Sequence, residues 1–273
     1  MNAPSGSTAE DYDAFYREFD SPLQRQIRLE AYGEDIGQHS WVTAADLRGD
    51  IARLRLASAS RFLDLGCGPC GPLTFILSSV GCQGTGTELS AAALAVGRTR
   101  AAALGVGHLL TAREADLDHA LPLPDGSFDA AMSLDVVLHL RDRAAFFREV
   151  ARTLRPAGRF LFTDAGVVTG TVSDEEIARR SVHGGTWFAA PGFNERMLEQ
   201  SGLRLLEIED RTAGALRNAT GRRAARLAHR AELESLEGAA GFERQQRYLE
   251  TVIEISRRVA VSRIMYLAEA PGS

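Results

Sequence analysis

The 273-residue sequence contains no lysine, and all 31 of its Lys or Arg positions are arginine. Without lysine there is no Schiff-base nucleophile and no lysine of the kind that P-loops use to hold phosphates. The net charge is −5. This charge argues against a general polyanion-binding protein, because nonspecific affinity for nucleic acids comes from clustered positive charge.

Cysteine is scarce, and long apolar runs are absent. Three cysteines, Cys67, Cys70 and Cys82, are too few for a disulfide framework in a chain of this size, and a zinc site lacks its second ligand pair. No stretch approaches the roughly 20 apolar residues of a membrane span. The first residues are small, polar and acidic, unlike a signal peptide. We therefore expect a cytoplasmic protein.

Apolar runs alternate with helical patterns through the middle of the chain. Residues 1–10 have the composition of a disordered tail, and residues 11–56 have an amphipathic helical pattern broken at Gly33 and Gly37. Strands are expected at 61–65, 83–88, 109–112, 128–134 and 159–163, and helices at 90–104 and 143–154. This alternation predicts an α/β fold with a parallel, doubly wound sheet.

The last third of the chain has a different pattern. A helix is expected at 191–201, a strand at 203–210, a charged helical region at 221–261 with a break near 238–241, and a strand at 263–269. We therefore expect a tail and helical cap over residues 1–56. The main domain should cover 57–273, with a helical insertion at about 212–261 before the last strand.

A glycine-rich turn follows the first strand at Asp64-Leu65-Gly66-Cys67-Gly68-Pro69-Cys70-Gly71. Its glycines fit the G-x-G-x-x-G pattern of nicotinamide and flavin sites. Asp64 counts against that interpretation, because a carboxylate would repel a pyrophosphate, whereas it suits a ligand that carries an ammonium group. The Cys67–Cys70 pair also fits a thiol–disulfide motif, but the flanking glycines and the large α/β remainder fit that motif badly.

The same turn resembles the first motif of class I S-adenosylmethionine-dependent methyltransferases, with Cys70 in place of the third glycine. Further resemblances follow in order: Glu88 at the end of the second strand, Glu114-Ala115-Asp116-Leu117, the loop 121–129 and the turn 154–159. The resemblance implies a Rossmann-like sheet of seven mostly parallel strands. It also implies that Glu88 holds the ribose hydroxyls and that Asp116 accepts a hydrogen bond from the adenine amino group.

Two further segments resemble phosphoethanolamine and sarcosine/dimethylglycine N-methyltransferases. The first, Asp135-Val136-Val137-Leu138-His139, makes His139 the candidate base or orienting group for the acceptor and Asp135 a polar contact. The second, residues 32–41, resembles their cap, which gives Gln38 and Tyr32 as contacts to the cofactor. The expected cofactor residues are Asp64, Gly66, Cys67, Gly68, Glu88, Leu89, Asp116, Leu117, Ser133, Gln38 and Tyr32.

Two other segments remain open. The stretch 183–188, with Trp187, is expected to help line the acceptor pocket, where Trp187 could hold an ammonium, stack on an aromatic acceptor or fill core. Arginine recurs at 211, 217, 222, 223, 226 and 230, and acidic residues follow closely. We interpret this stretch as a solvated helix face and not as an RNA-binding surface.

The sequence therefore predicts a methyltransferase that uses S-adenosylmethionine, with S-adenosylhomocysteine as product, and that methylates a small-molecule nitrogen or oxygen in specialised metabolism. A small-molecule C-methyltransferase and a nonenzymatic S-adenosylmethionine-binding regulatory protein are the alternatives. The expected partner is a small-molecule methyl acceptor, with no nucleic acid, membrane or metal. Assembly into a homodimer is left open.

Overall fold

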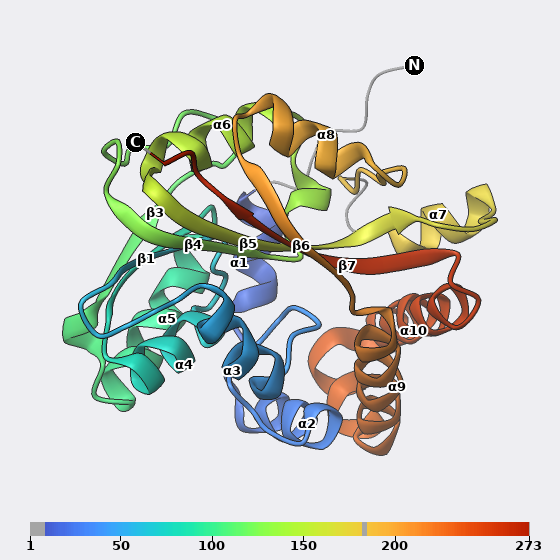
Figure 1. The fold of residues 1–273 in the computed structure, drawn as a ribbon. Helices are drawn as coiled ribbons and strands as arrows, with labels where there is room; N and C mark the ends of the chain where they lie inside the picture. The colour runs from blue at the N-terminus through green and yellow to red at the C-terminus, as the bar shows by residue number, and fades with distance from the viewer. Residues whose placement is uncertain (1–8, 182–184, 273) are drawn as a thin grey trace.

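A seven-stranded sheet runs through the centre of the computed structural model, which describes residues 9–181 and 185–272 (Figure 1). The strand order is β3-β2-β1-β4-β5-β7-β6. The first five strands are parallel, and β7 is antiparallel to β5 and to β6. The strands are β1 (Arg61–Leu65), β2 (Gln83–Glu88), β3 (Leu110–Glu114), β4 (Phe128–Leu134), β5 (Leu154–Val168), β6 (Arg204–Asp210) and β7 (Val261–Glu269). The predicted seven-stranded, mostly parallel sheet is confirmed.

The chain changes direction across the sheet between β1 and β4. These two strands are neighbours, with Phe62 opposite Ala130, but β1 leads to β2 on one side and β4 leads to β5 on the other. In open α/β sheets such a switch point leaves a crevice at the carboxyl ends of the strands, where ligands bind. The topology therefore places the loops after β1 and β4 on either side of a crevice.

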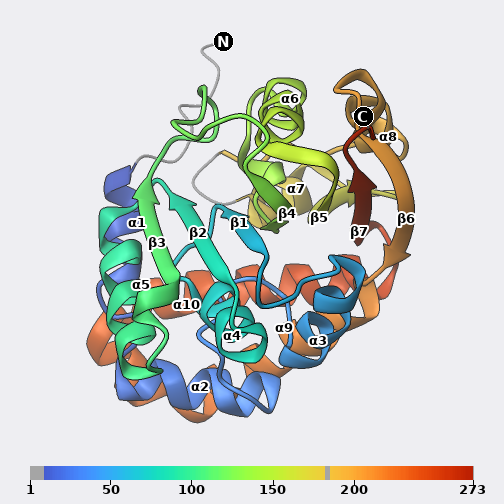
Figure 2. The same cartoon turned by 60° about the vertical axis from the view of Figure 1, so that its left-hand side comes forward.

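Helices cover both faces of the sheet. On one face lie α3 (Ala44–Arg53), α4 (Gly71–Val80) and α5 (Ala91–Ala103), and on the other lie α6 (Arg143–Thr153) and α8 (Phe193–Gln200) (Figures 1 and 2). The apolar positions of each helix recur at helical spacing, as in Leu73, Ile76 and Leu77 of α4, so that one stripe packs on the strands. Two 3-10 turns, Gly107–Leu109 and Val137–His139, precede β3 and follow β4.

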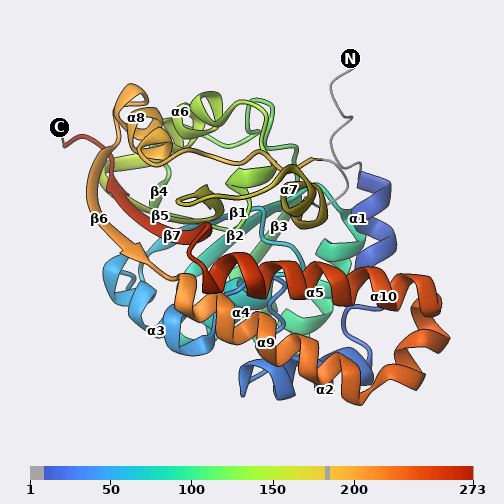
Figure 3. The ribbon, with the colours of Figure 1, turned by 90° about the vertical axis from the view of Figure 1, so that its right-hand side faces the viewer.

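Five further helices surround the crevice. Helix α1 (Ala9–Tyr16) packs against α5, α2 (Pro22–Tyr32) packs against α9 (Thr212–Ala228), and α7 (Asp174–Arg180) packs against α10 (Arg230–Arg257). Helices α9 and α10 follow β6 and precede β7 in the sequence, and they run side by side (Figure 3). The predicted break near 238–241 is present at Gly238, whose φ of 73° is not helical. None of the helices in the described residues has the length and apolarity needed to cross a lipid bilayer.

Several predicted boundaries were wrong. Strand β5 extends from 154 to 168, beyond the predicted 159–163. Its start lies earlier because Leu154 pairs with Phe128 of β4, and its end lies later because its pairing with β7 continues through Asp164 and resumes at Val167 after a bulge. Helix α9 begins at Thr212, earlier than the expected start near Gly221. Of the expected N-terminal tail, residues 1–8 lie outside the described residues, whereas residues 9 and 10 begin α1.

The solvated face predicted for the arginine-rich stretch was wrong for three of its members. Arg211 is buried in an ion pair with Asp50 (Nη2–Oδ1 2.6 Å), and Arg226 is buried in an ion pair with Glu237. Arg222 lies over the ring of Trp41, with 5.2 Å between its Cζ and the ring centroid. The physical reason is that α9 packs between α2 and α10, so that much of its surface is covered.

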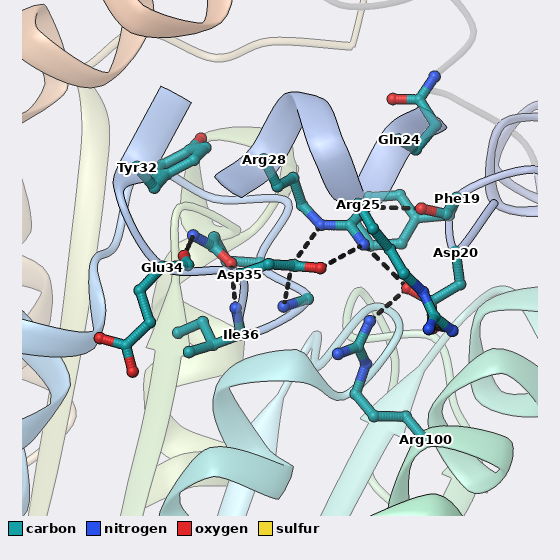
Figure 4. Close-up of polar contacts among 12 residues, drawn as sticks. Phe19, Asp20, Gln24, Arg25, Arg28, Tyr32, Glu34, Asp35, Ile36 and Arg100 are labelled. Carbon is teal, nitrogen blue, oxygen red and sulfur yellow. Dashed lines mark hydrogen bonds and ion pairs between the residues drawn. The ribbon is translucent and has the colours of Figure 1, made fainter. Parts of the chain in front are cut away.

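The side chain of Arg28 joins the segment between α1 and α2 to the loop after α2 through buried polar contacts (Figure 4). Its guanidinium donates to Asp35 (Nε–Oδ1 2.7 Å), to Asp20 (Nη2–Oδ1 2.9 Å) and to the carbonyl oxygen of Phe19 (2.6 Å). Asp20 also pairs with Arg100 of α5. The cap is therefore held to the body of the protein by a charge cluster that is largely removed from water.

We expect Arg28→Met to lower the free energy of unfolding by about 3 kcal/mol, because it leaves the buried carboxylate of Asp35 without its ion-pair partner. Arg25→Met is the matched control. Arg25 also pairs with Asp20, but its side chain is 58% exposed, so the loss should stay below about 1 kcal/mol. Urea unfolding of both variants measures the difference, and equal losses would contradict a special role for the Arg28 cluster.

Candidate active site

A cavity of about 850 Å³ lies at the carboxyl ends of the strands, between the sheet and the cap. Its sheet side is formed by the residues at the ends of β1, β2 and β4 and by the loop after β3. Its cap side includes the aromatic residues Phe15, Tyr16 and Trp41. The volume falls in the upper part of the range of small-molecule sites, roughly 300–1,000 Å³. The crevice that the topology predicts is thus closed over by helices far apart in the sequence.

The turn after β1 requires glycine at two positions. Gly66 has a φ of 75°, and a Cβ there would lie 2.6 Å from the side chain of Val136. A Cβ on Gly71 would lie 2.1 Å from the carbonyl oxygen of Gly37 in the cap. Cys70 has the left-handed φ of 53° at the position of the missing third glycine. Gly71 therefore serves the close approach of the cap to the turn.

Two buried carboxylates face the cavity where it meets this turn. Asp64 is 2% exposed, and burial together with the nearby Glu88 raises the pKa of Asp64 to about 8. Burial also raises the pKa of Glu88, although the backbone N–H groups of Ser90, Gly68 and Leu89 donate to its carboxylate and oppose the shift. Among the described residues, neither carboxylate has a basic side chain at ion-pair distance. This end of the cavity, which we call the cofactor end, therefore attracts a cation.

Most of the predicted cofactor residues line the cavity together. Those that do so are Asp64, Gly66, Cys67, Gly68, Glu88, Leu89, Asp116 and Leu117. Asp116 also accepts hydrogen bonds from the N–H of Asp118 (2.9 Å) and from His119, so that it supports its own turn as well as facing the cavity. The predicted cofactor residues lie together because the parallel sheet brings the carboxyl ends of β1, β2 and β3 to one edge.

The structure does not bring three of the predicted residues to the cavity lining. Gln38 is buried and forms hydrogen bonds with the backbone of Glu34 and Ile36. The hydroxyl of Tyr32 donates to the carbonyl oxygen of Ser40 (3.2 Å). Ser133 donates to the carbonyl oxygen of Leu65 (2.9 Å) and so joins β4 to β1. All three polar groups are thus engaged in hydrogen bonds with the backbone.

His139 and Asp135 both line the cavity, His139 as a neutral ring and Asp135 as a carboxylate in an ion pair. The Nδ1 atom of His139 lies 3.1 Å from the carbonyl oxygen of Gly185. A carbonyl oxygen only accepts, so Nδ1 carries the proton and Nε2 keeps its lone pair. Burial lowers the pKa of His139, which keeps the ring neutral at pH 7. Asp135 is engaged in an ion pair with Arg263 (2.9 Å) and accepts a hydrogen bond from the Trp41 N–H.

The structure adds cavity residues that the sequence did not single out as site residues. They are chiefly His39, Arg180, Arg222 and Tyr248. Arg180 and Tyr248 come from α7 and α10, and no spacing pattern links two residues this far apart in the chain. Trp187 is 42% exposed and does not line the cavity, whereas Gly185 does. His183, in the same predicted segment, lies outside the described residues.

The cysteine pair in the turn is buried and reduced. The sulfur atoms of Cys67 and Cys70 are 3.5 Å apart. The hydrogen bond from Cys70 and burial raise the pKa of the Cys67 thiol well above its usual value. Because the thiolate is the nucleophile in thiol–disulfide chemistry, these surroundings disfavour that role.

Comparison with known proteins finds similarity to methyltransferases. Residues 63–162 match the family described as "Methyltransferase domain". The chain is 33% identical over 164 residues to the methyltransferase GfsG of Streptomyces halstedii, a match that covers 58% of each protein. It is 31% identical over 205 residues to the glycine/sarcosine/dimethylglycine N-methyltransferase of Actinopolyspora halophila, covering 74% of this chain and 35% of that protein. The chain thus spans between one third and three fifths of the length of these relatives.

Solved structures share the fold over nearly the whole chain. The phosphoethanolamine N-methyltransferase 2 of Haemonchus contortus, in complex with S-adenosylhomocysteine, superposes with a TM-score of 0.78 at 19% identity and covers 94% of this chain and 60% of that one. The [4+2]-cyclase SpnF superposes with a TM-score of 0.76 at 20% identity over 100% of both chains. At this identity the likeness shows the fold alone. Residues 63–162 thus match a methyltransferase domain, and the chain as a whole has the fold of class I methyltransferases.

Proposed function

We propose that this protein transfers a methyl group from S-adenosylmethionine to a nitrogen or oxygen atom of a small molecule. The observation that supports this proposal is a single cavity that contains the buried carboxylates Asp64 and Glu88 at one end and the neutral imidazole of His139 at the other. The cap covers one side of the cavity, so that two small molecules can be aligned beneath it, and alignment is a large part of catalysis in group transfer.

The residues at the cofactor end fit S-adenosylmethionine. When bound, this cofactor supplies a methyl group on a sulfonium, whose carbon–sulfur electron pair returns to sulfur on transfer. Asp64 is a buried carboxyl group without a basic partner among the described residues, and its ionised form suits the ammonium group of the cofactor. Glu88 accepts three backbone hydrogen bonds, and a carboxylate with about four acceptor positions has capacity left for a ribose hydroxyl.

His139 is suited to accept a proton from the acceptor. Its Nδ1–H bond to Gly185 fixes the ring and leaves Nε2 as the basic atom. The lowered pKa keeps this atom unprotonated at neutral pH, although it also makes the imidazole a weaker base. An ammonium or hydroxyl acceptor that hydrogen-bonds to Nε2 would lose its proton there, which frees the lone pair that attacks the methyl carbon.

Calorimetric titration with S-adenosylhomocysteine, with NADH as the control ligand, tests the cofactor. We expect micromolar binding of the first and none of the second, because the cofactor end has two carboxyl groups and, among the described residues, no basic side chain paired with them that could hold a pyrophosphate. Incubation with S-adenosylmethionine and a panel of amines, phenols and carbon acids then tests turnover. Binding of NADH instead would contradict the proposal. Tight binding of S-adenosylhomocysteine without turnover of any acceptor would favour a regulatory role.

Affinity for S-adenosylhomocysteine should rise with pH between about pH 6 and 8. The free protein holds a proton on Asp64 below its raised pKa of about 8, and binding of the ligand's ammonium group requires the ionised form. One proton released on binding gives up to about a tenfold gain in affinity per pH unit, ending above pH 8.

Asp64→Asn should bind more weakly and remove most of this slope, whereas Asp116→Asn should keep it, because Asp64 is intact in that variant. Titrations at pH 6, 7 and 8 measure the three slopes. A wild-type affinity that does not change over this range would contradict the role of Asp64.

His139→Gln should slow methylation of a proton-bearing acceptor by about 10²-fold or more, because the variant lacks a basic nitrogen while its amide can still donate to Gly185. His108→Gln, in the 3-10 turn before β3 and outside the cavity, is the control. Single-turnover rates with S-adenosylmethionine and an acceptor found in the screen measure the effect. A rate that equals that of the wild type would exclude His139 as the base.

A further inference from the structure

Six arginines of the described chain are almost fully buried, and five of them have a carboxylate partner. The five ion pairs are Arg28–Asp35, Arg143–Asp164, Arg211–Asp50, Arg226–Glu237 and Arg263–Asp135. Arg180, which is 3% exposed, is the sixth, and no carboxylate of the described residues lies within ion-pair distance of it. A buried cation without a counter-charge is costly, so such a residue indicates that a ligand supplies the anion.

The contacts of Arg180 are to neutral groups. Its Nη1 donates to the hydroxyl of Tyr248 (3.1 Å), and its Nη2 donates to the carbonyl oxygen of Ala165 (3.1 Å). A guanidinium has five N–H donors, and these two contacts leave others available. Arg180, Tyr248 and Ala165 all line the cavity. The contacts therefore hold the guanidinium at the cavity wall and leave its charge uncompensated.

A second guanidinium reaches the same region. Arg222 lies over the ring of Trp41 and lines the cavity, and within the described ranges it too lacks a carboxylate at ion-pair distance. The nearby carboxylate of Asp135 is already paired with Arg263. We call this region, with Arg180, Arg222 and Tyr248, the acceptor end of the cavity. Its charge is positive, opposite to that of the cofactor end.

We infer that the methyl acceptor carries an anionic group, a carboxylate or a phosphate, that binds between Arg180 and Arg222. This inference rests on the function proposed above and names the class of its substrate. Planar guanidinium groups bind carboxylates and phosphates through paired hydrogen bonds, and Tyr248 adds a neutral donor beside Arg180.

The direction of methyl transfer supports the same conclusion. Transfer moves the positive charge of the sulfonium toward an acceptor beside two arginines. That shift is unfavourable for a neutral acceptor, because fixed charges stabilise a reaction only where they oppose the charge that develops. An acceptor that brings its own negative charge neutralises the arginines before the transfer begins.

The carboxylate of the cofactor itself is the competing partner for Arg180. Arg180 is anchored to Ala165 of β5, which lies two strands from β1, at a spacing of roughly 10 Å. This separation favours the acceptor over the cofactor as the ligand of Arg180. The experiment below distinguishes the two.

The test is a calorimetric titration of the protein saturated with S-adenosylhomocysteine. The probes are inorganic pyrophosphate, inorganic phosphate and benzoate, and benzyl alcohol is the neutral control. We expect at least one anion to bind and benzyl alcohol not to bind, and the stronger of the phosphate and benzoate arms identifies the anionic group. Arg180→Gln and Arg222→Gln should each weaken anion binding at least tenfold. Arg223→Gln, adjacent on α9 and outside the cavity, should leave it unchanged.

Each other outcome has a definite meaning. If S-adenosylhomocysteine binds but no anion does, or if Arg180→Gln binds anions like the wild type, the inference is wrong and the proposed function stands. If Arg180→Gln loses as much affinity for S-adenosylhomocysteine as for anions, Arg180 binds the cofactor. If the wild type does not bind S-adenosylhomocysteine, both proposals fail. Thermal unfolding distinguishes a loss of binding from misfolding of the variant. Arg180→Gln removes an uncompensated charge and should therefore not lower the Tm.

Discussion

The buried ion pair between Asp135 and Arg263 connects the three parts of this structure that form the cavity. Asp135 follows β4 and has a left-handed φ of 58°, and its carboxylate accepts hydrogen bonds from Arg263 of β7 and from the Trp41 N–H of the cap. Burial alone would raise the pKa of Asp135, but Arg263 and the hydrogen bonds hold it below the usual value, so the carboxylate stays charged. The turn that carries His139 follows directly, and its position therefore depends on this pair.

The sequence predicted the sheet well because its signals are local. The predicted limits of β2 and β4 match those in the structure, and the order of motifs gave Asp64, Glu88 and Asp116 as neighbours near the ends of parallel strands. It predicted less where contacts are distant. Arg180 and Tyr248 meet only because α7 packs on α10, and no sequence pattern encodes that contact. The resemblance also suggested Gln38 as a cofactor contact, whereas the side chain of Gln38 forms hydrogen bonds within its own loop.

The fold does not by itself decide the chemistry. The cyclase SpnF has the same fold over its full length, so the reaction has to be argued from the cavity. Here the argument rests on which buried charges lack partners. Elsewhere in the described chain the buried arginines have carboxylate partners. The buried ionisable groups without an ion-pair partner at the cavity are Arg180 at one end and the carboxyl groups of Asp64 and Glu88 at the other. Unpaired charge is thus concentrated where ligands are expected.

The absence of lysine has a consequence for how this cavity recognises its ligands. Its basic end is built from guanidinium groups, which stay charged throughout the range near neutral pH, whereas the raised pKa of Asp64 makes the charge of the acidic end depend on pH there. Near neutral pH, the positive charge at one end of the cavity therefore does not change with pH, whereas the negative charge at the other end does. The electric field between the two ends orients a dipolar ligand before contact and draws oppositely charged molecules to opposite ends. With the proposed function, the cavity would sort its two substrates by charge, and acidification would weaken the binding of only one of them.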